Sequence, residues 1–176
     1  MAEFNSYANP KVETKRFKIY ADVSEGSGNP EWELQGRGVG SWTVDENEDI
    51  TKEPDVLGYI DMERGTPQQT QTGVIVNLRK GSKFGSLLFD AWFTGDKSKL
   101  DAMKFLQKFE FVDGTDENTC RARLEEDVLV SINSFNGEAA GYLSFDIDIH
   151  YANMRTIGTM PKVDGDEITF TPASAA

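Results

Sequence analysis

Apolar and polar residues alternate along most of this chain, in the two-residue period that is typical of half-buried β-strands. From this alternation and the intervening turns we predict strands at 16–23, 32–35, 41–47, 56–64, 74–78, 103–112, 121–134 and 142–151, followed by the segments 154–160 and 168–171. The pair Asn136-Gly137 lies between two of these segments and is a strong signal for a β-hairpin. Together these features predict about eight antiparallel strands.

One segment departs from the two-residue period and follows the period of a helix instead. Its apolar residues fall at i, i+3, i+4, i+7 and i+8: Phe84, Leu87, Leu88, Ala91 and Trp92. That spacing places them in one stripe on a helix surface. Ser82 is a suitable N-cap, and Gly95 stands where glycine commonly ends a helix. We therefore predict a helix over about 82–94.

These elements predict a mainly β fold, an antiparallel β-sandwich or barrel of about eight strands with one flanking helix. At 176 residues the chain has the length of one domain, which we place at 15–172. Residues 1–14 are polar and without periodicity, so we expect an N-terminal arm that becomes ordered on contact with a partner. The small residues at 173–176 predict a flexible tail, and the acidic stretch 45–55 predicts a long loop or hairpin.

Carboxylates dominate the charge of the chain. Thirty Asp and Glu against eighteen Lys and Arg give a net charge of −12, which argues against a basic nucleic-acid footprint and against adhesion to an anionic membrane. The apolar runs are far shorter than the roughly 20 residues that span a bilayer, and the first residues do not resemble a secretory signal. With Cys120 as the single cysteine, we expect no disulfide within the chain and folding in a reducing cytoplasm.

Residues that carry hydrolytic chemistry do not converge along the sequence. His150, the single histidine, lies on the polar side of a predicted strand with Asp148 two residues away, and we interpret it as a solvated side chain. Cys120 follows an acidic loop whose carboxylates disfavour a thiolate nucleophile. The turn 164–167 lacks the residue order of an EF-hand loop. We therefore expect no enzyme activity, no metal site and no cofactor.

Three predicted strands carry pairs of carboxylates at i and i+2, each pair on one strand face. At a rise of about 3.3 Å per residue the two members lie about 6.5–7 Å apart, a spacing that a glycosidase could use. Repetition on three strands indicates an acidic surface rather than one active site. That surface is either the solvated outer face of a monomer or the lining of the bore of a ring. The pairs are Asp61/Glu63, Glu125/Asp127 and Asp146/Asp148.

Several segments, taken in their order along the chain, carry a resemblance to a known family. They are 38–49 (GVGSWTVDENED), 55–59 (DVLGY), 80–84 (KGSKF), 94–96 (TGD), 122–130 (ARLEEDVLV), 144–149 (SFDIDI) and 158–159 (GT). Over about residues 30–172 the chain resembles the major tail tube proteins of long-tailed bacteriophages. The order of elements carries this resemblance as much as the residues do.

The resemblance implies a structural protein of the virion tail, assembled in the host cytoplasm. It implies the fold that phage tail tubes share with secretion-system tubes, six copies in a ring, and rings stacked into a tube. Each subunit would give one sheet to a continuous barrel around the lumen, and a hairpin would reach into the neighbouring ring. The implied partners are further copies of the chain and the tape-measure, tail-tip and tail-terminator proteins. Double-stranded DNA would pass from capsid to host without specific binding.

An acidic bore suits this role, because DNA carries one negative charge per roughly 1.7 Å of axis and a basic bore would retain it. We therefore take the paired carboxylates as candidates for the lining of the lumen: Asp61, Glu63, Glu125, Asp127, Asp146 and Asp148. The acidic loop 45–55, with the strand 56–64, is the best candidate for the hairpin that stacks rings. Its candidate residues are Asp45, Glu46, Glu48, Asp49 and Pro54.

Two alternatives stay open at this point. One is the tube of a contractile tail or a related injection machine, which would share the fold. The other belongs to a different class, a monomeric carbohydrate-binding β-sandwich whose aromatic side chains stack on sugars. Its stacking residues would be Trp32, Tyr59 and Tyr142.

Overall fold

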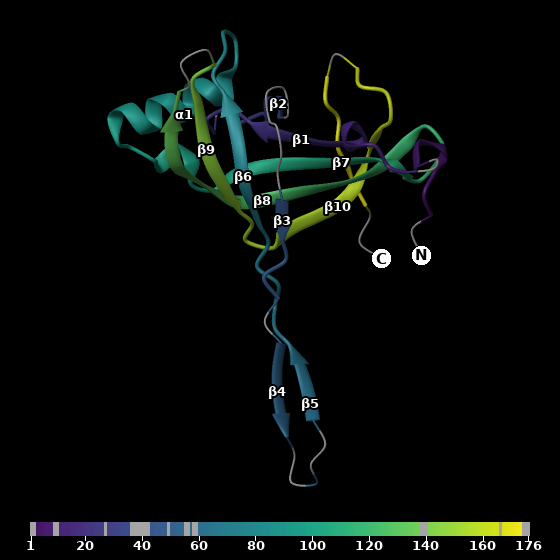
Figure 1. The fold of residues 1–176 in the computed structure, drawn as a ribbon. Helices are drawn as coiled ribbons and strands as arrows, with labels where there is room; N and C mark the ends of the chain where they lie inside the picture. The colour runs from purple at the N-terminus through teal and green to yellow at the C-terminus, as the bar shows by residue number, and fades with distance from the viewer. Residues whose placement is uncertain are drawn as a thin grey trace.

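The computed structural model describes residues 3–8, 11–26, 28–35, 43–48, 50–54, 57, 60–137, 141–165 and 167–173, with only the backbone at 51, 53–54 and 60–63. Within these residues the chain forms antiparallel β structure with one α-helix against the sheet (Figure 1). The mainly β class, the antiparallel pairing and the flanking helix agree with the sequence prediction, although the sheet does not close into a barrel.

Nine of the described strands belong to one sheet and two form a separate hairpin. The sheet has the order β2-β1-β7-β8-β9-β6-β3, with β10 paired to β8 and β11 paired to β10. Its strands are β1 (Phe17–Asp22), β2 (Trp32–Gln35), β3 (Thr43–Asp45), β6 (Thr70–Asn77), β7 (Met103–Asp113), β8 (Thr119–Asn136), β9 (Ser144–His150), β10 (Met154–Pro161) and β11 (Thr171–Pro172). The hairpin consists of β4 (Ile50–Pro54) and β5 (Ile60–Arg64), and short 3₁₀ turns lie at Ser6–Ala8, Thr14–Arg16 and Ser98–Leu100.

The helix α1 (Lys83–Thr94) begins and ends at the residues that its sequence signals predict. The Ser82 side chain accepts a hydrogen bond from the Gly85 backbone N–H at 3.0 Å, as an N-cap does. Gly95 takes the left-handed conformation at φ 76° and ends the helix. A second cap comes from β2, where the Glu33 carboxylate accepts the Lys83 backbone N–H at 2.8 Å. This contact fixes the start of the helix to the edge of the sheet.

The main core lies between α1 and the strands β1, β6, β7, β8 and β9 of the sheet. Phe84 and Leu88 from the helix are buried there with Phe105 from β7 and Phe145 and Ile147 from β9. The rings of Phe84 and Phe105 meet edge to face with centroids 6.2 Å apart, a favoured aromatic geometry. Each large apolar side chain buried in this way stabilises the fold by roughly 1.5–3 kcal/mol, so the apolar stripe holds the helix in place.

A second, smaller core lies on the other face of the sheet, around Tyr20, Leu106, Cys120, Ala122 and Met160. The C-terminal segment covers it, because Ile168 and Phe170 pack against these residues. Gly158 makes this close packing possible: a Cβ at that position would lie 2.3 Å from the Thr171 carbonyl oxygen. Any larger residue there would force the C-terminal segment away from the sheet.

A β-bulge in β8 reverses the predicted alternation of its side chains. The register passes from Phe105 opposite Glu125 to Met103 opposite Val128, so β8 has one extra residue. The exposed Asp127 takes the left-handed conformation at this point, with φ 55°. As a result Glu125 lies on the same face as Val128. The prediction that Glu125 and Asp127 lie together on one strand face is therefore wrong, since a simple period of two does not include a bulge.

The predicted acidic loop 45–55 is largely regular structure. Its first residue ends β3, and Ile50–Pro54 forms β4, which pairs with β5 from Ile50 opposite Arg64 to Pro54 opposite Ile60. The hairpin leaves the body of the molecule and extends away from the sheet (Figure 1). The sequence prediction of a long loop or hairpin is thus realised as a hairpin, with one more strand than the hydrophobic pattern indicates.

The N-terminal arm contacts β7 of its own chain. Phe4 pairs with Val112 in an isolated bridge, and the Asn5 amide donates to the Asp113 carboxylate at 2.8 Å. The Arg16 guanidinium lies 3.8 Å from the centre of the Tyr7 ring. These contacts place the arm along the C-terminal end of β7, near Val112 and Asp113. Residues 174–176 of the predicted flexible tail lie outside the described residues.

Candidate assembly surfaces

A polar surface covers the outer side of the strands β3, β6, β9 and β8. In β9 the side chains of Phe145, Ile147 and Ile149 point into the main core, so the alternating residues face the other way. The cross-strand pairing brings small polar residues beside them, together with two apolar residues, Ile75 opposite Asp146 and Leu129 opposite His150. We call this surface the polar face and define it by Asp45, Thr70, Thr72, Ser131, Ser134, Asp146, Asp148 and His150.

Two of the three carboxylates of the polar face, Asp45 and Asp148, are bound by neutral donors, while one carboxylate oxygen of the half-buried Asp146 is enclosed without a hydrogen-bond partner among the described residues. Asp148 accepts the Gly73 backbone N–H at 3.2 Å, and Asp45 accepts the Thr72 hydroxyl at 3.3 Å. His150 shares a 3.2 Å hydrogen bond with the Ser131 hydroxyl. Among the residues that the structure describes, no lysine or arginine forms an ion pair with Asp45, Asp146 or Asp148. The face is therefore acidic and uncompensated.

The six lumen candidates do not lie together. Asp146 and Asp148 share the polar face, and Asp127 is exposed at the bulge of β8. Asp61 and Glu63 belong to β5 of the projecting hairpin, where the structure describes the backbone. Of the three predicted carboxylate pairs, Asp146/Asp148 on β9 therefore lies on the polar face, and the other two pairs lie elsewhere in the molecule.

Glu125 was predicted as a candidate for the lining of the lumen, but its side chain is fully buried. Its carboxylate lies 2.9 Å from the Arg123 guanidinium and 3.4 Å from that of Arg155 on β10. Burial raises the pKa of Glu125, and the two arginines oppose that shift. A carboxylate enclosed in this way cannot line a bore, so Glu125 is removed from the set of lumen candidates.

The same two arginines hold the base of the projecting hairpin. Arg155 and Arg123 donate to the Gln69 amide oxygen at 2.9 and 3.2 Å. The Gln69 amide nitrogen in turn donates to the Glu46 carboxylate at 2.7 Å. Glu46 and Gln69 stand on the two chain segments that lead into and out of the hairpin. We call this contact set, Glu46, Gln69, Arg123, Glu125 and Arg155, the hairpin root.

The stacking candidates follow the hairpin from its root outward. Asp45 ends β3, Glu46 belongs to the root, and the Glu48 carboxylate pairs with Arg64 at 3.1 Å. Pro54 ends β4, and Asp49 lies outside the described residues. The strand β4 covers about 13 Å from Ile50 to Pro54 at roughly 3.3 Å per residue. Leu57, which lies between the two strands, is 77% exposed.

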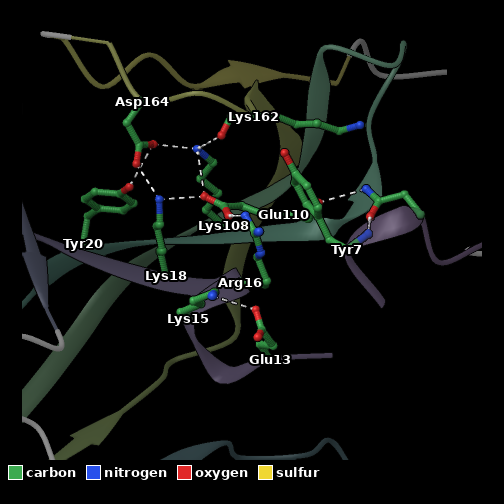
Figure 2. Close-up of polar contacts among 11 residues, drawn as sticks. Tyr7, Glu13, Lys15, Arg16, Lys18, Tyr20, Lys108, Glu110, Lys162 and Asp164 are labelled. Atoms are coloured by element: carbon green, nitrogen blue, oxygen red, sulfur yellow. Dashed lines mark hydrogen bonds and ion pairs between the residues drawn. The ribbon is translucent and has the colours of Figure 1, made fainter. Parts of the chain in front are cut away.

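A charged network fastens the C-terminal segment over the second core (Figure 2). Lys108 is fully buried, and its ammonium group contacts the Asp164 carboxylate at 2.6 Å. Lys18 joins Asp164 to Glu110, with N–O distances of 2.5 and 2.6 Å. Burial opposes ionisation of Asp164, yet the hydrogen bonds from Lys108 and Lys18 lower its pKa. We call Lys18, Lys108, Glu110 and Asp164 the charged network.

Sequence reasoning did not find the hairpin root or the charged network. Gln69 and Arg155 are far apart in the sequence and carry no local motif, and the turn at Asp164 reads as a solvated loop. The one available signal was the pair of charged residues Lys108 and Glu110, which lie between Leu106 and Val112 near the middle of a strand. Such a position requires a buried partner, since an unpaired buried charge is costly.

The residues of the alternative functions are separated in the fold. The Cys120 thiol is buried in the second core, where burial raises its pKa to about 11, and His150 lies on the polar face. Trp32 stands in β2 and Tyr142 in the turn before β9, with β1, β7 and β8 between these strands. Tyr59 lies outside the described residues. Trp32 and Tyr142 therefore do not form one sugar-stacking platform.

In the described part of the chain, no group of three or more His, Cys, Asp or Glu side chains is arranged to hold a metal ion. Of the helices in these ranges, none has the length and apolar character needed to cross a membrane.

We found no family model that matches the chain and no curated protein that is similar to it. Among solved structures, the fold is similar to a chain of the sheath-tube complex of an extracellular contractile injection system, PVC, in the extended state. The identity is 12%, the TM-score is 0.48, and 92% of this chain and 91% of that chain are covered.

A chain of the sheath/tube terminator of PVC is similar at 14% identity and TM-score 0.49, over 82% of this chain and 94% of that chain. A chain of the tube-terminating cap of the anti-feeding prophage is similar at 14% identity and TM-score 0.47, over 84% and 90%. Because these identities and scores are low, we base the function on the geometry of this chain.

Proposed function

We propose that this chain is a structural subunit that assembles with copies of itself into rings, which stack into the tail tube of a bacteriophage. Following the sequence resemblance, the ring has six copies and the tube conducts double-stranded DNA into the host. The hairpin carries this proposal, because β4 and β5 pair only with each other among the described strands. A two-stranded hairpin is marginally stable by itself in water, so a neighbouring subunit is expected to support it.

The open ends of the sheet support ring formation. In the described strand order β2 and β3 stand at the two ends, and each has one neighbour. A strand edge with unpaired backbone groups tends to pair with another chain. In a ring, the edge of one subunit would pair with the edge of the next, and the sheets would then form a continuous barrel.

The polar face supports a bore for DNA. It presents hydroxyl groups and the carboxylates of Asp45, Asp146 and Asp148, without ion-paired cations in the described residues. Turned inward in a ring, three carboxylates per subunit would repel the phosphates of passing DNA. Like-charge repulsion would keep DNA from adhering to the wall.

Exposed aromatic side chains on α1 support burial in an assembly. Phe93 is 73% exposed, Trp92 44% and Phe89 38%, and the rings of Phe89 and Phe93 stack at 5.7 Å. Contiguous exposed apolar surface on a small protein commonly marks an interaction site. Contacts between subunits, or with another tail protein, would cover this group.

The proposal is tested by neutralising the polar face. We expect Asp146→Asn with Asp148→Asn to leave tube assembly intact but to slow DNA release from particles whose tails contain the variant. The physical reason is the loss of repulsion between the bore and DNA. Asp90→Asn with Asp101→Asn, which changes charge equally at exposed positions elsewhere, is the control and should release DNA at the wild-type rate. Equal rates for both variants would refute an acidic bore on this face.

A further inference from the structure

A basic turn lies at the opposite end of β6 from the hairpin. Arg79 and Lys80 lie in the turn between β6 and α1, Lys83 is the first residue of α1, and the sequence from 70 to 89 has no Asp or Glu. In Figure 1 the hairpin extends downward from the start of β6, and this turn lies above the end of the same strand. The eight residues of β6 separate the two by about 26 Å at roughly 3.3 Å per residue.

Two cations of this turn are available to a partner. Lys83 is paired with Glu31 at 2.5 Å, and Glu33 already caps the start of the helix. Arg79 and Lys80 are exposed and form no ion pair with any residue that the structure describes. Glu31 and Glu33 line the same hollow but are bound by Lys83 and by the start of the helix, and Asp90 shares a second hollow with Arg79. Arg79 and Lys80 thus form an exposed pair of cations without an ion-pair partner among the described residues, in a chain of net charge −12.

The hairpin carries the complementary charge. The hairpin at 50–64 contains the four carboxylates Glu53, Asp55, Asp61 and Glu63 and the two cations Lys52 and Arg64, a net charge of −2, and the acidic residues Glu48 and Asp49 directly precede it. Within the described side chains, Arg64 pairs with Glu48. Neighbouring like charges on two paired strands repel one another. A cationic surface on another molecule would offset this repulsion.

We propose that the acidic hairpin of one copy docks against the basic turn at Arg79 and Lys80 of a copy in the next ring. The proposal rests on the proposed tube function and identifies the residues of its stacking contact. An acidic and a basic surface at opposite ends of one subunit form a head-to-tail contact, which repeats without closing and produces a filament of rings. Charge complementarity fixes the direction of stacking and makes the contact sensitive to salt.

Charge reversal at each end, and then at both, tests the contact. The turn variant is Arg79→Glu with Lys80→Glu, the hairpin variant is Asp61→Lys with Glu63→Lys, and the combined variant carries all four changes. We expect each of the first two to raise the lowest protein concentration that yields tubes roughly tenfold or more at low salt, because like charges then face each other. The combined variant should return this concentration toward the wild-type value. Sedimentation and negative-stain electron microscopy measure it.

The control is Lys97→Glu with Arg121→Glu, which makes the same change in charge at two exposed positions away from the turn. It should assemble at the wild-type concentration, and the neutral variant Arg79→Gln with Lys80→Gln should have an intermediate effect. Unchanged thermal unfolding confirms that each variant is folded. If the wild-type protein forms tubes and the turn variant forms them at the same protein concentration, the docking contact is wrong while the tube function stands. Impaired single-end variants without recovery in the combined variant would overturn the pairing of these two surfaces, and wild-type protein without tubes would overturn the tube function itself.

Discussion

At the scale of single residues, the fold depends on charges that are buried in pairs. Lys108 reaches Asp164 from inside the sheet, and Glu125 reaches two arginines across β8 and β10. An isolated buried charge is strongly unfavourable, so each of these residues requires its partner. The charged network thereby holds the C-terminal segment in place, and the hairpin root holds the hairpin.

The charged network can be tested through Asp164→Asn. The change leaves the buried Lys108 ammonium with weaker partners, and we expect the free energy of unfolding to fall by about 2 kcal/mol in urea titration. Asp90→Asn, at an exposed position on α1, is the control and should change this free energy by less than about 0.5 kcal/mol. A loss no larger than that of the control would contradict the importance of the network.

The dependence of stability on pH gives a second test of the same carboxylate. Hydrogen bonds from the lysines hold the pKa of Asp164 below its ordinary value of 3.8, so the folded state binds its proton less readily than the unfolded state. The contribution of the Asp164 carboxylate to stability is therefore fully present at neutral pH. It is lost as the pH falls through the pKa of Asp164 in the folded state. We expect wild-type protein to lose more stability between pH 6 and pH 3 than Asp164→Asn does. Equal losses would show that the carboxylate is not coupled to folding.

At the scale of elements, the hairpin and its root are separable. The root contacts involve Glu46 and Gln69, whereas β4 and β5 begin several residues further out. The described contacts of the root lie within the body of the molecule, with β8 and β10. The body should therefore fold without the outer part of the hairpin.

Deletion of residues 50–64, closed by a short glycine linker, tests this division. We expect the variant to be soluble with a melting temperature close to that of wild type, because the root and both cores are kept. It should form rings or monomers but no long tubes, since the element that we propose to stack rings is missing. Circular dichroism and electron microscopy measure the two properties. Long tubes from the deleted protein would show that the hairpin does not stack rings.

The sequence predicts the regular elements well where local rules decide them. The helix follows from its apolar stripe, Ser82 and Gly95, and β9 follows from strict alternation. The strand β4 was missed because Ile50–Pro54 contains two charges and a proline, a composition typical of a loop. Local rules also do not predict the bulge at Asp127, which depends on pairing with β7.

At the scale of the whole molecule, long-range pairing decides which predictions succeed. The polar face could be predicted in part, since Asp146 and Asp148 alternate with core residues of one strand. The hairpin root could not, because Glu46, Gln69, Arg123 and Arg155 meet only when β8 and β10 pair beside the start of β6. Glu125 lies in that root rather than on a surface for the same reason, because its partner Arg155 comes from β10.

The whole molecule has features that a solitary domain would not need: a hairpin without a partner strand in the described sheet, an uncompensated acidic face and exposed aromatic residues on its helix. The central claim is that copies of the chain cover these features in a tube. Negative-stain electron microscopy of the purified protein, concentrated over several days, tests it most directly. The account predicts tubes or stacked rings with a stain-filled bore. Particles that stay monomeric at every concentration would contradict it.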